Sequence, residues 1–152
     1  MTAATVAQVW DWLAAVPDPE IPAISIVDLG IVRRIAWSGD ELRVAITPTY
    51  SGCPATTMIR RDIVSALHGH GLDRVRLDVE LSPPWSTAAI TASGHDKLRA
   101  YGIAPPNPDI AIACPRCDSS AVECTSRFGS TPCKALYRCT ACREPFDVFK
   151  CH

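Results

Sequence analysis

Hydrophobic residues near the start of the chain have the spacing of an α-helix. Four apolar residues lie three and four positions apart: Val6, Val9, Trp10 and Leu13. This spacing places them in one apolar stripe along a helix. The stretch VPDPEIP follows at 16–22, and its prolines cannot continue helical hydrogen bonding. The pattern predicts a short amphipathic helix that ends before this stretch.

The apolar period then changes to two residues, which is typical of β-strands. LGIVRRIAW (29–37) and ELRVAIT (41–47) alternate apolar and polar positions around the turn SGD, which predicts a hairpin. Strict alternation puts Ile35 on one face of the first strand and Val32 on the other. RVRLDVEL (74–81) alternates most regularly and predicts a third strand.

One face of this small sheet needs a cover, and the segment 54–68 can supply it. Ile59, Ile63 and Leu67 repeat there at helical spacing, so the segment predicts a helix that packs on the sheet. A last helix is expected at about 93–101. The fold class predicted for this part is α+β, a small helix-covered sheet.

A proline-rich segment divides the chain. YGIAPPNPDIAIA contains three prolines within four positions, Pro105, Pro106 and Pro108, and reads as a stiff extended linker. We therefore predict a domain at 1–104, a linker at 105–112 and a second domain at 113–152.

Composition and charge narrow the class of protein. The hydrophobic content of 47% suffices for a core, and the net charge of -1 gives no field that would attract nucleic acid or an anionic membrane. No run approaches the roughly 20 apolar residues of a membrane span, and MTAATVAQVWDWL has no export signal. We expect a cytoplasmic protein, in which clustered cysteines bind metal more readily than they form disulfides.

Two C-x2-C motifs carry the strongest chemical signal. CPRC and CTAC place four cysteines in pairs that are separated by 21 residues: Cys114, Cys117, Cys139 and Cys142. Four thiolates close a tetrahedral structural zinc site that has no open position. With a Gly-Ser turn between the motifs and a strand pattern in EPFDVFK, the segment predicts a β zinc ribbon. A single iron or an iron-sulfur cluster on the same sulfurs is the alternative.

The chain carries further thiols and a histidine beyond these four ligands. If residues near 138 pair with residues near 145, Cys133 lies almost opposite Cys151. A hairpin that turns near Gly129 brings Cys124 within a residue or two of the same level. These three cysteines and His152 could then form a second thiol site, and packed thiols or a disulfide are the alternatives.

In the first domain, TYSGCPAT places Cys53 beside the predicted start of a helix. Free N–H groups and the positive end of the helix dipole favour a thiolate there, which is a nucleophile or a soft-metal ligand. A small buried hydrophobe in a tight turn is the alternative. The acidic residues Asp18, Glu20 and Asp28 could face Cys53, although Asp residues beside prolines more often stabilise turns.

The segments PDPEIPAISIVDLGIV and TPTYSGCPAT resemble the metal-sulfur cluster biosynthesis (MIP18) family, which includes SufT. The resemblance implies a MIP18 family-like α/β domain and a role in iron-sulfur cluster assembly or transfer. It places Cys53 at the motif cysteine of the family and makes three residues its acidic positions: Asp18, Glu20 and Asp28. These four residues are the cluster-transfer candidates.

The tail FGSTPCKALYRCTACREPFDVFKCH, together with HDKLRAYGIAPP, is similar to the D-subunit family of bacterial phenylacetyl-CoA epoxidase systems. This resemblance implies an accessory, non-catalytic protein of aerobic phenylacetate degradation, which serves iron or iron-sulfur cofactor assembly or maintenance. Its partners would be subunits of the epoxidase complex or the iron-sulfur reductase of that complex. The implied cofactors are a structural zinc and a transient iron or iron-sulfur cluster.

Other functions compete with this interpretation. The chain could be a structural adaptor whose ribbon holds only zinc and whose Cys53 is inert. Nucleic-acid binding is disfavoured by the mixed charge of the ribbon, and a thiol enzyme lacks a base, because His68 and His70 lie at the far end of the helix that Cys53 would begin. Whether the chain forms a homodimer is left open.

Overall fold

The structure is a computed structural model that describes residues 3–49, 55–107 and 109–150. Cys53, Cys151 and His152 therefore lie outside the described residues. Contacts between Cα atoms divide the chain into two compact units, Met1–Thr91 and Ala92–His152. Within the described residues, no helix is long and apolar enough to cross a membrane.

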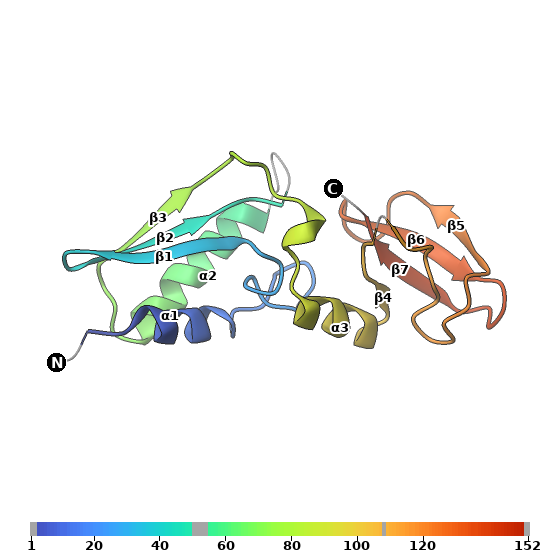
Figure 1. Ribbon diagram of the computed structural model, residues 1–152, viewed down its shortest axis with the longest axis horizontal. Coiled ribbons are helices and arrows are strands. Elements are labelled where there is room, and N and C mark those ends of the chain that lie inside the picture. The colour runs from blue at the N-terminus through green and yellow to red at the C-terminus, as the bar shows by residue number, and fades with distance from the viewer. Residues whose placement is uncertain (1–2, 50–54, 108, 151–152) are drawn as a thin grey trace. The chain divides into compact units, whose positions relative to one another are not determined.

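The first unit contains the helices and strands that its hydrophobic pattern predicts. The two helices and the three strands all form, and a short 3-10 turn follows them (Figure 1). Their bounds are α1 Val6–Leu13, β1 Val32–Ser38, β2 Glu41–Ile46, α2 Ala55–Gly69, β3 Val75–Val79 and η1 Thr87–Ala89. The side chain of Thr5 caps α1 by accepting a hydrogen bond from the N–H of Gln8.

The sheet has the order β1-β2-β3, with β1 antiparallel and β3 parallel to β2. The predicted orientation of Val32 is wrong. A register shift between Val32 and Arg34 pairs Val32 with Ile46, on the same face as the pair Ile35 and Val44. The extra residue of this β-bulge brings Val32 back to the buried face, where strict alternation had excluded it.

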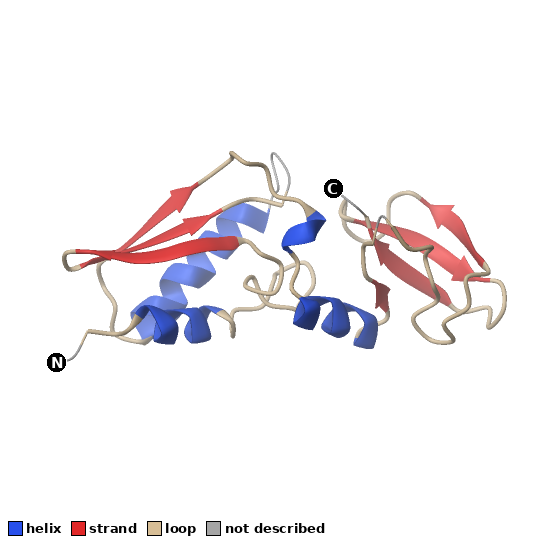
Figure 2. Ribbon diagram, in the orientation of Figure 1, coloured by secondary structure: helices blue, strands red, loops and turns tan. Residues whose placement is uncertain are grey.

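The core of the first unit lies between the sheet and α2, which covers one of its faces (Figure 2). α2 buries Ile59, Ile63 and Leu67 at the predicted helical spacing. The inward residues of β2 are almost completely shielded from solvent: Leu42, Val44 and Ile46. Burial of such side chains is worth about 1.5–3 kcal/mol each, so α2 and β2 form the stable centre of the unit.

The second unit is a four-stranded sheet with one helix, and its strand order is β4-β7-β6-β5. Its elements are α3 Ala92–Ala100, β4 Ile103–Ala104, β5 Val122–Ser126, β6 Lys134–Cys139 and β7 Pro145–Phe149. The predicted boundary at 104 assigned α3 and β4 to the first domain. Contacts between Cα atoms group both elements with the ribbon, because β4 pairs in parallel with β7. The predicted domain bounds stay a prediction.

Candidate metal centre

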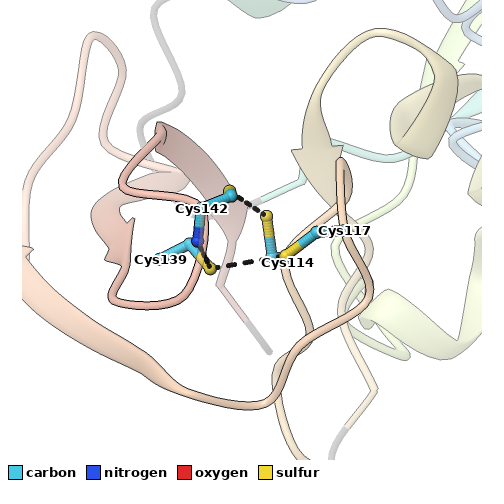
Figure 3. Close-up of side chains that lie close together, drawn as sticks. All are labelled: Cys114, Cys117, Cys139 and Cys142. Atoms are coloured by element: carbon cyan, nitrogen blue, oxygen red, sulfur yellow. Dashed lines mark hydrogen bonds between the residues drawn. The ribbon is translucent and has the colours of Figure 1, made fainter.

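Four cysteine side chains converge in the second unit, two before β5 and two at the end of β6 (Figure 3). The sulfur atoms of Cys114 and Cys142 lie 3.7 Å apart, and those of Cys117 and Cys139 lie 3.6 Å apart. All four sulfurs lie within 4.8 Å of one another. The structure thus brings together the four residues that the two C-x2-C motifs singled out.

These distances fit a single tetrahedral metal ion. With metal–sulfur bonds near 2.3 Å, ideal tetrahedral geometry separates neighbouring sulfurs by about 3.8 Å. A polynuclear iron-sulfur cluster would need wider spacing, because its own iron and sulfide atoms would lie between the thiolates. The donor set is therefore that of a mononuclear site with four sulfur ligands.

The two C-x2-C motifs share one backbone geometry. In each, the N–H of the first cysteine donates to a carbonyl five residues later, from Cys114 to Ser119 at 2.9 Å and from Cys139 to Glu144 at 2.9 Å. These bonds close the two loops that present the sulfurs. In each loop the first cysteine is buried and the second is exposed, so the metal would lie at the border between core and solvent.

A left-handed residue follows the second cysteine of each motif. Asp118 has a φ of 61° and Arg143 a φ of 66°, a conformation that favours glycine. The residue types do not reveal this requirement, because neither position is glycine. The signal that could have revealed it is position, since both residues stand at the same place in repeated loops.

Backbone donors prepare one thiol for metal binding. The N–H of Cys142 points at the sulfur of Cys139, at 3.4 Å, and with the N–H of Ala141 it lowers the pKa of the Cys139 thiol to about 7. Amide hydrogen bonds stabilise a thiolate because they place positive charge beside sulfur. These two amides therefore favour the anionic form of Cys139, which a metal ligand requires.

The sheet register agrees with one of the two pairings on which the predicted second thiol site was based. Arg138 pairs with Pro145 as expected, and the N–H of Lys150 donates to the carbonyl of Cys133. The expected level of Cys124 is wrong: it pairs with Tyr137, four residues along β6 from Cys133, or about 13 Å along a strand. The pairing of Ser126 with Leu136 centres the turn near Thr131, beyond the expected turn at Gly129, and this causes the offset.

Two further findings bear on these thiols. Cys124 is exposed, whereas Cys133 is buried, and the hydroxyl of Thr131 lies 3.0 Å from the sulfur of Cys133. Because Cys151 and His152 lie outside the described residues, a site that combines them with Cys133 stays a prediction.

In the first unit, the two predicted aspartates stabilise turns. Asp18 is buried and accepts hydrogen bonds from the N–H groups of Glu20 and Ile21, at 3.0 and 2.8 Å. Asp28 is also buried and accepts from the N–H of Ser25 at 3.3 Å. This turn role is the alternative that the sequence favoured. Because Cys53 lies outside the described residues, the idea that these acidic residues face it stays a prediction.

Comparisons with known proteins agree with this two-part organisation. Residues 6–79 match the family described as iron-sulfur cluster assembly protein, and residues 102–150 match the PaaD zinc beta ribbon domain. The proposed D subunit of 1,2-phenylacetyl-CoA epoxidase from Escherichia coli strain K12 is 44% identical in an alignment 151 residues long that covers 95% of this chain and 92% of that protein.

Two solved structures resemble the first part of the chain. A domain of unknown function from Bacillus anthracis is 27% identical, with a TM-score of 0.56 over 61% of this chain and 90% of that chain. A conserved hypothetical protein from Thermotoga maritima is also 27% identical, with a TM-score of 0.55 over 64% of this chain and 98% of that chain. The chain therefore belongs to the PaaD family, in which a MIP18-type iron-sulfur cluster assembly domain precedes a zinc ribbon.

Proposed function

We propose that this protein is an accessory subunit of a bacterial phenylacetyl-CoA epoxidase system and serves the assembly or maintenance of an iron or iron-sulfur cofactor in it. The observation that carries the proposal is the near full-length similarity to the proposed D subunit of such an enzyme. The match of the first part to an iron-sulfur cluster assembly family supports the cofactor role. The protein itself performs no step of the epoxidation.

The ribbon has a structural role in the proposed function. Cys114, Cys117, Cys139 and Cys142 hold one zinc ion, which four thiolates coordinate completely. Such an ion offers no open position to a substrate, so its contribution is the folded ribbon. The ribbon then provides a surface for an epoxidase subunit or for the iron-sulfur reductase of the system.

The first unit carries the cofactor chemistry. Cys53 supplies the thiolate that receives iron or a cluster transiently, and it follows β2 and precedes α2 in the chain. Asp18 and Asp28, two of the other candidates, fix the loops to which they belong by accepting hydrogen bonds from backbone N–H groups. Ordered loops keep a transient ligand in one geometry, which a metal-transfer site needs.

Anaerobic reconstitution tests this division of labour. The purified chain is incubated with ferrous iron and sulfide, desalted, and analysed for zinc, iron and sulfide per chain. We expect one zinc plus additional iron in the wild type, and zinc alone in Cys53→Ser. Cys124→Ser is the matched control, because its thiol is exposed and lies outside the four-cysteine cluster.

The same variants are then added to an epoxidase complex prepared without this protein. Recovery of iron in the complex with wild type and Cys124→Ser, and its loss with Cys53→Ser, would support the proposal. Full recovery with Cys53→Ser and no uptake of iron by the wild type would instead favour the structural adaptor that holds only zinc.

A further inference from the structure

Among the described residues of the first unit, β3 has an open hydrogen-bonding edge. It is the last strand in the order β1-β2-β3 (Figure 1). At the inner edge of this strand, the carbonyl of Arg74 accepts a hydrogen bond from the N–H of Leu42 in β2, and the N–H of Glu80 donates to the carbonyl of Ile46. Because alternate residues of a strand direct their backbone groups to opposite sides, the odd-numbered residues direct theirs to the open edge. These residues are Val75, Leu77 and Val79.

The inward face of β3 is also incompletely covered. Its residues pair with the shielded residues of β2, so that Leu77 lies beside Val44, which is 0% exposed. Val75 and Leu77 are nevertheless only half-buried, and Val79 is 40% exposed. α2 thus covers β2 fully and leaves part of the apolar face of β3 open to solvent.

A groove of about 610 Å³ runs between α2 and β3. Its apolar lining consists of Val64, Val75 and Leu77. The other lining residues include cationic or titratable side chains of α2. The latter are Arg60, Arg61 and His68, all of which are exposed. The groove therefore combines an apolar floor, a basic wall and an unpaired strand edge.

The arginines of this wall differ from those on the sheet. Arg43 lies 3.1 Å from a carboxylate oxygen of Asp78, and Arg74 pairs with Asp40. Across the described ranges, neither Arg60 nor Arg61 pairs with a carboxylate. The positive charge of the wall is therefore free to attract an anionic partner.

We propose that this groove binds an extended acidic segment of a partner protein, which adds to β3 as a fourth strand. The open edge supplies alternating backbone donors and acceptors, the floor accepts apolar side chains, and Arg60 and Arg61 receive carboxylates. A nucleic acid fits less well, because it cannot use the strand edge and the chain has a net charge of -1. The proposal does not depend on the metal chemistry proposed above.

A synthetic peptide tests the proposal with the full, metal-loaded chain. The probe is a fluorescent heptapeptide of alternating glutamate and valine, titrated by fluorescence anisotropy at low salt. We expect saturable binding, and weaker binding to Arg60→Glu/Arg61→Glu by roughly fivefold to thirtyfold, because two favourable ion pairs become repulsive. The matched control Arg60→Lys/Arg61→Lys keeps the charge and should bind within about threefold of wild type.

Backbone pairing is tested separately. A peptide with N-methyl groups on alternate residues cannot complete the ladder and should bind at least tenfold more weakly. Hydrogen exchange should slow at the N–H groups of Val75, Leu77 and Val79 when the unmodified peptide binds. The N–H groups of Arg76 and Asp78, which face β2, should change little.

Three results of the peptide titrations would overturn the proposal. They are the absence of saturable binding up to millimolar peptide, equal binding of the methylated and unmodified peptides, and equal binding of a peptide in which lysine replaces glutamate. A single-stranded oligonucleotide that binds more tightly than the peptide and displaces it would likewise overturn it. Circular dichroism of the exposed α2 variants establishes that a loss of binding does not reflect unfolding.

Discussion

At the scale of single residues, Gly30 fixes how the loop before β1 approaches η1. Its φ is +73°, and a Cβ placed on it would lie 2.5 Å from the carbonyl oxygen of Ala89. Two independent obstacles therefore meet at this position: a left-handed backbone, which costs an L-residue about 1–2 kcal/mol, and an overlap with backbone that cannot move aside easily.

We predict that Gly30→Ala lowers the free energy of unfolding of the first unit by about 3 kcal/mol or more. Urea denaturation followed by tryptophan fluorescence measures this change. Gly39→Ala is the control, since its φ is +62° but no atom lies within 4 Å of the added Cβ, and it should cost only about 1 kcal/mol. Equal losses in both variants would show that the contact with Ala89 is unimportant.

At the scale of elements, the two cysteine loops repeat the same turn with a left-handed residue other than glycine in each, and Arg143 is the less favourable of the two. Arg143 has a φ of 66° and lies between Cys142 and β7. Its side chain forms no ion pair within the residues described. Among the described residues, no ion pair of this side chain offsets the cost of the left-handed backbone.

We predict that Arg143→Gly stabilises the metal-loaded ribbon by about 1 kcal/mol, because glycine adopts this backbone without strain. The midpoint of metal release in a chelator titration should rise accordingly. Arg143→Ala provides the comparison: it removes the same side chain but keeps the strained backbone, so it should not stabilise. If alanine stabilises as much as glycine, the arginine side chain and not the backbone is unfavourable.

At the scale of the whole molecule, the two units differ in what holds them folded. The first has an apolar core between a sheet and α2. The second has a small core in which two of the cysteines take part: Ala104, Cys114, Cys139, Phe146 and Val148. Without metal these thiols lose their common partner, and in small metal domains binding energy is largely folding energy.

We predict that a chelator unfolds the second unit and leaves the first folded. All four tryptophans belong to the first unit, as the sequence and the division at Thr91 show, so their fluorescence should stay constant while the ribbon becomes sensitive to protease. Cys114→Ser should have the same effect without chelator, and Cys124→Ser should have none. A change in tryptophan emission on metal removal would contradict independent folding.

Much of this organisation could be predicted from the sequence because its causes are local. Apolar periods of 3.6 and 2 residues gave α1, α2 and three strands, since each period can bury only one face of its element. The four metal-site cysteines were identifiable because two C-x2-C motifs suffice to surround one ion. The turn role of Asp18 also follows from its neighbours in the chain.

What only the tertiary structure decided depends on pairing between distant segments. The bulge that turns Val32 inward is one extra residue in β1, and the level of Cys124 depends on where the turn between β5 and β6 falls. The apolar pattern fits either arrangement in both cases. The pairing of β4 with β7 joins segments more than 40 positions apart. The open edge of β3 is likewise invisible in its own sequence, because a strand becomes an edge only through the absence of a neighbour in space.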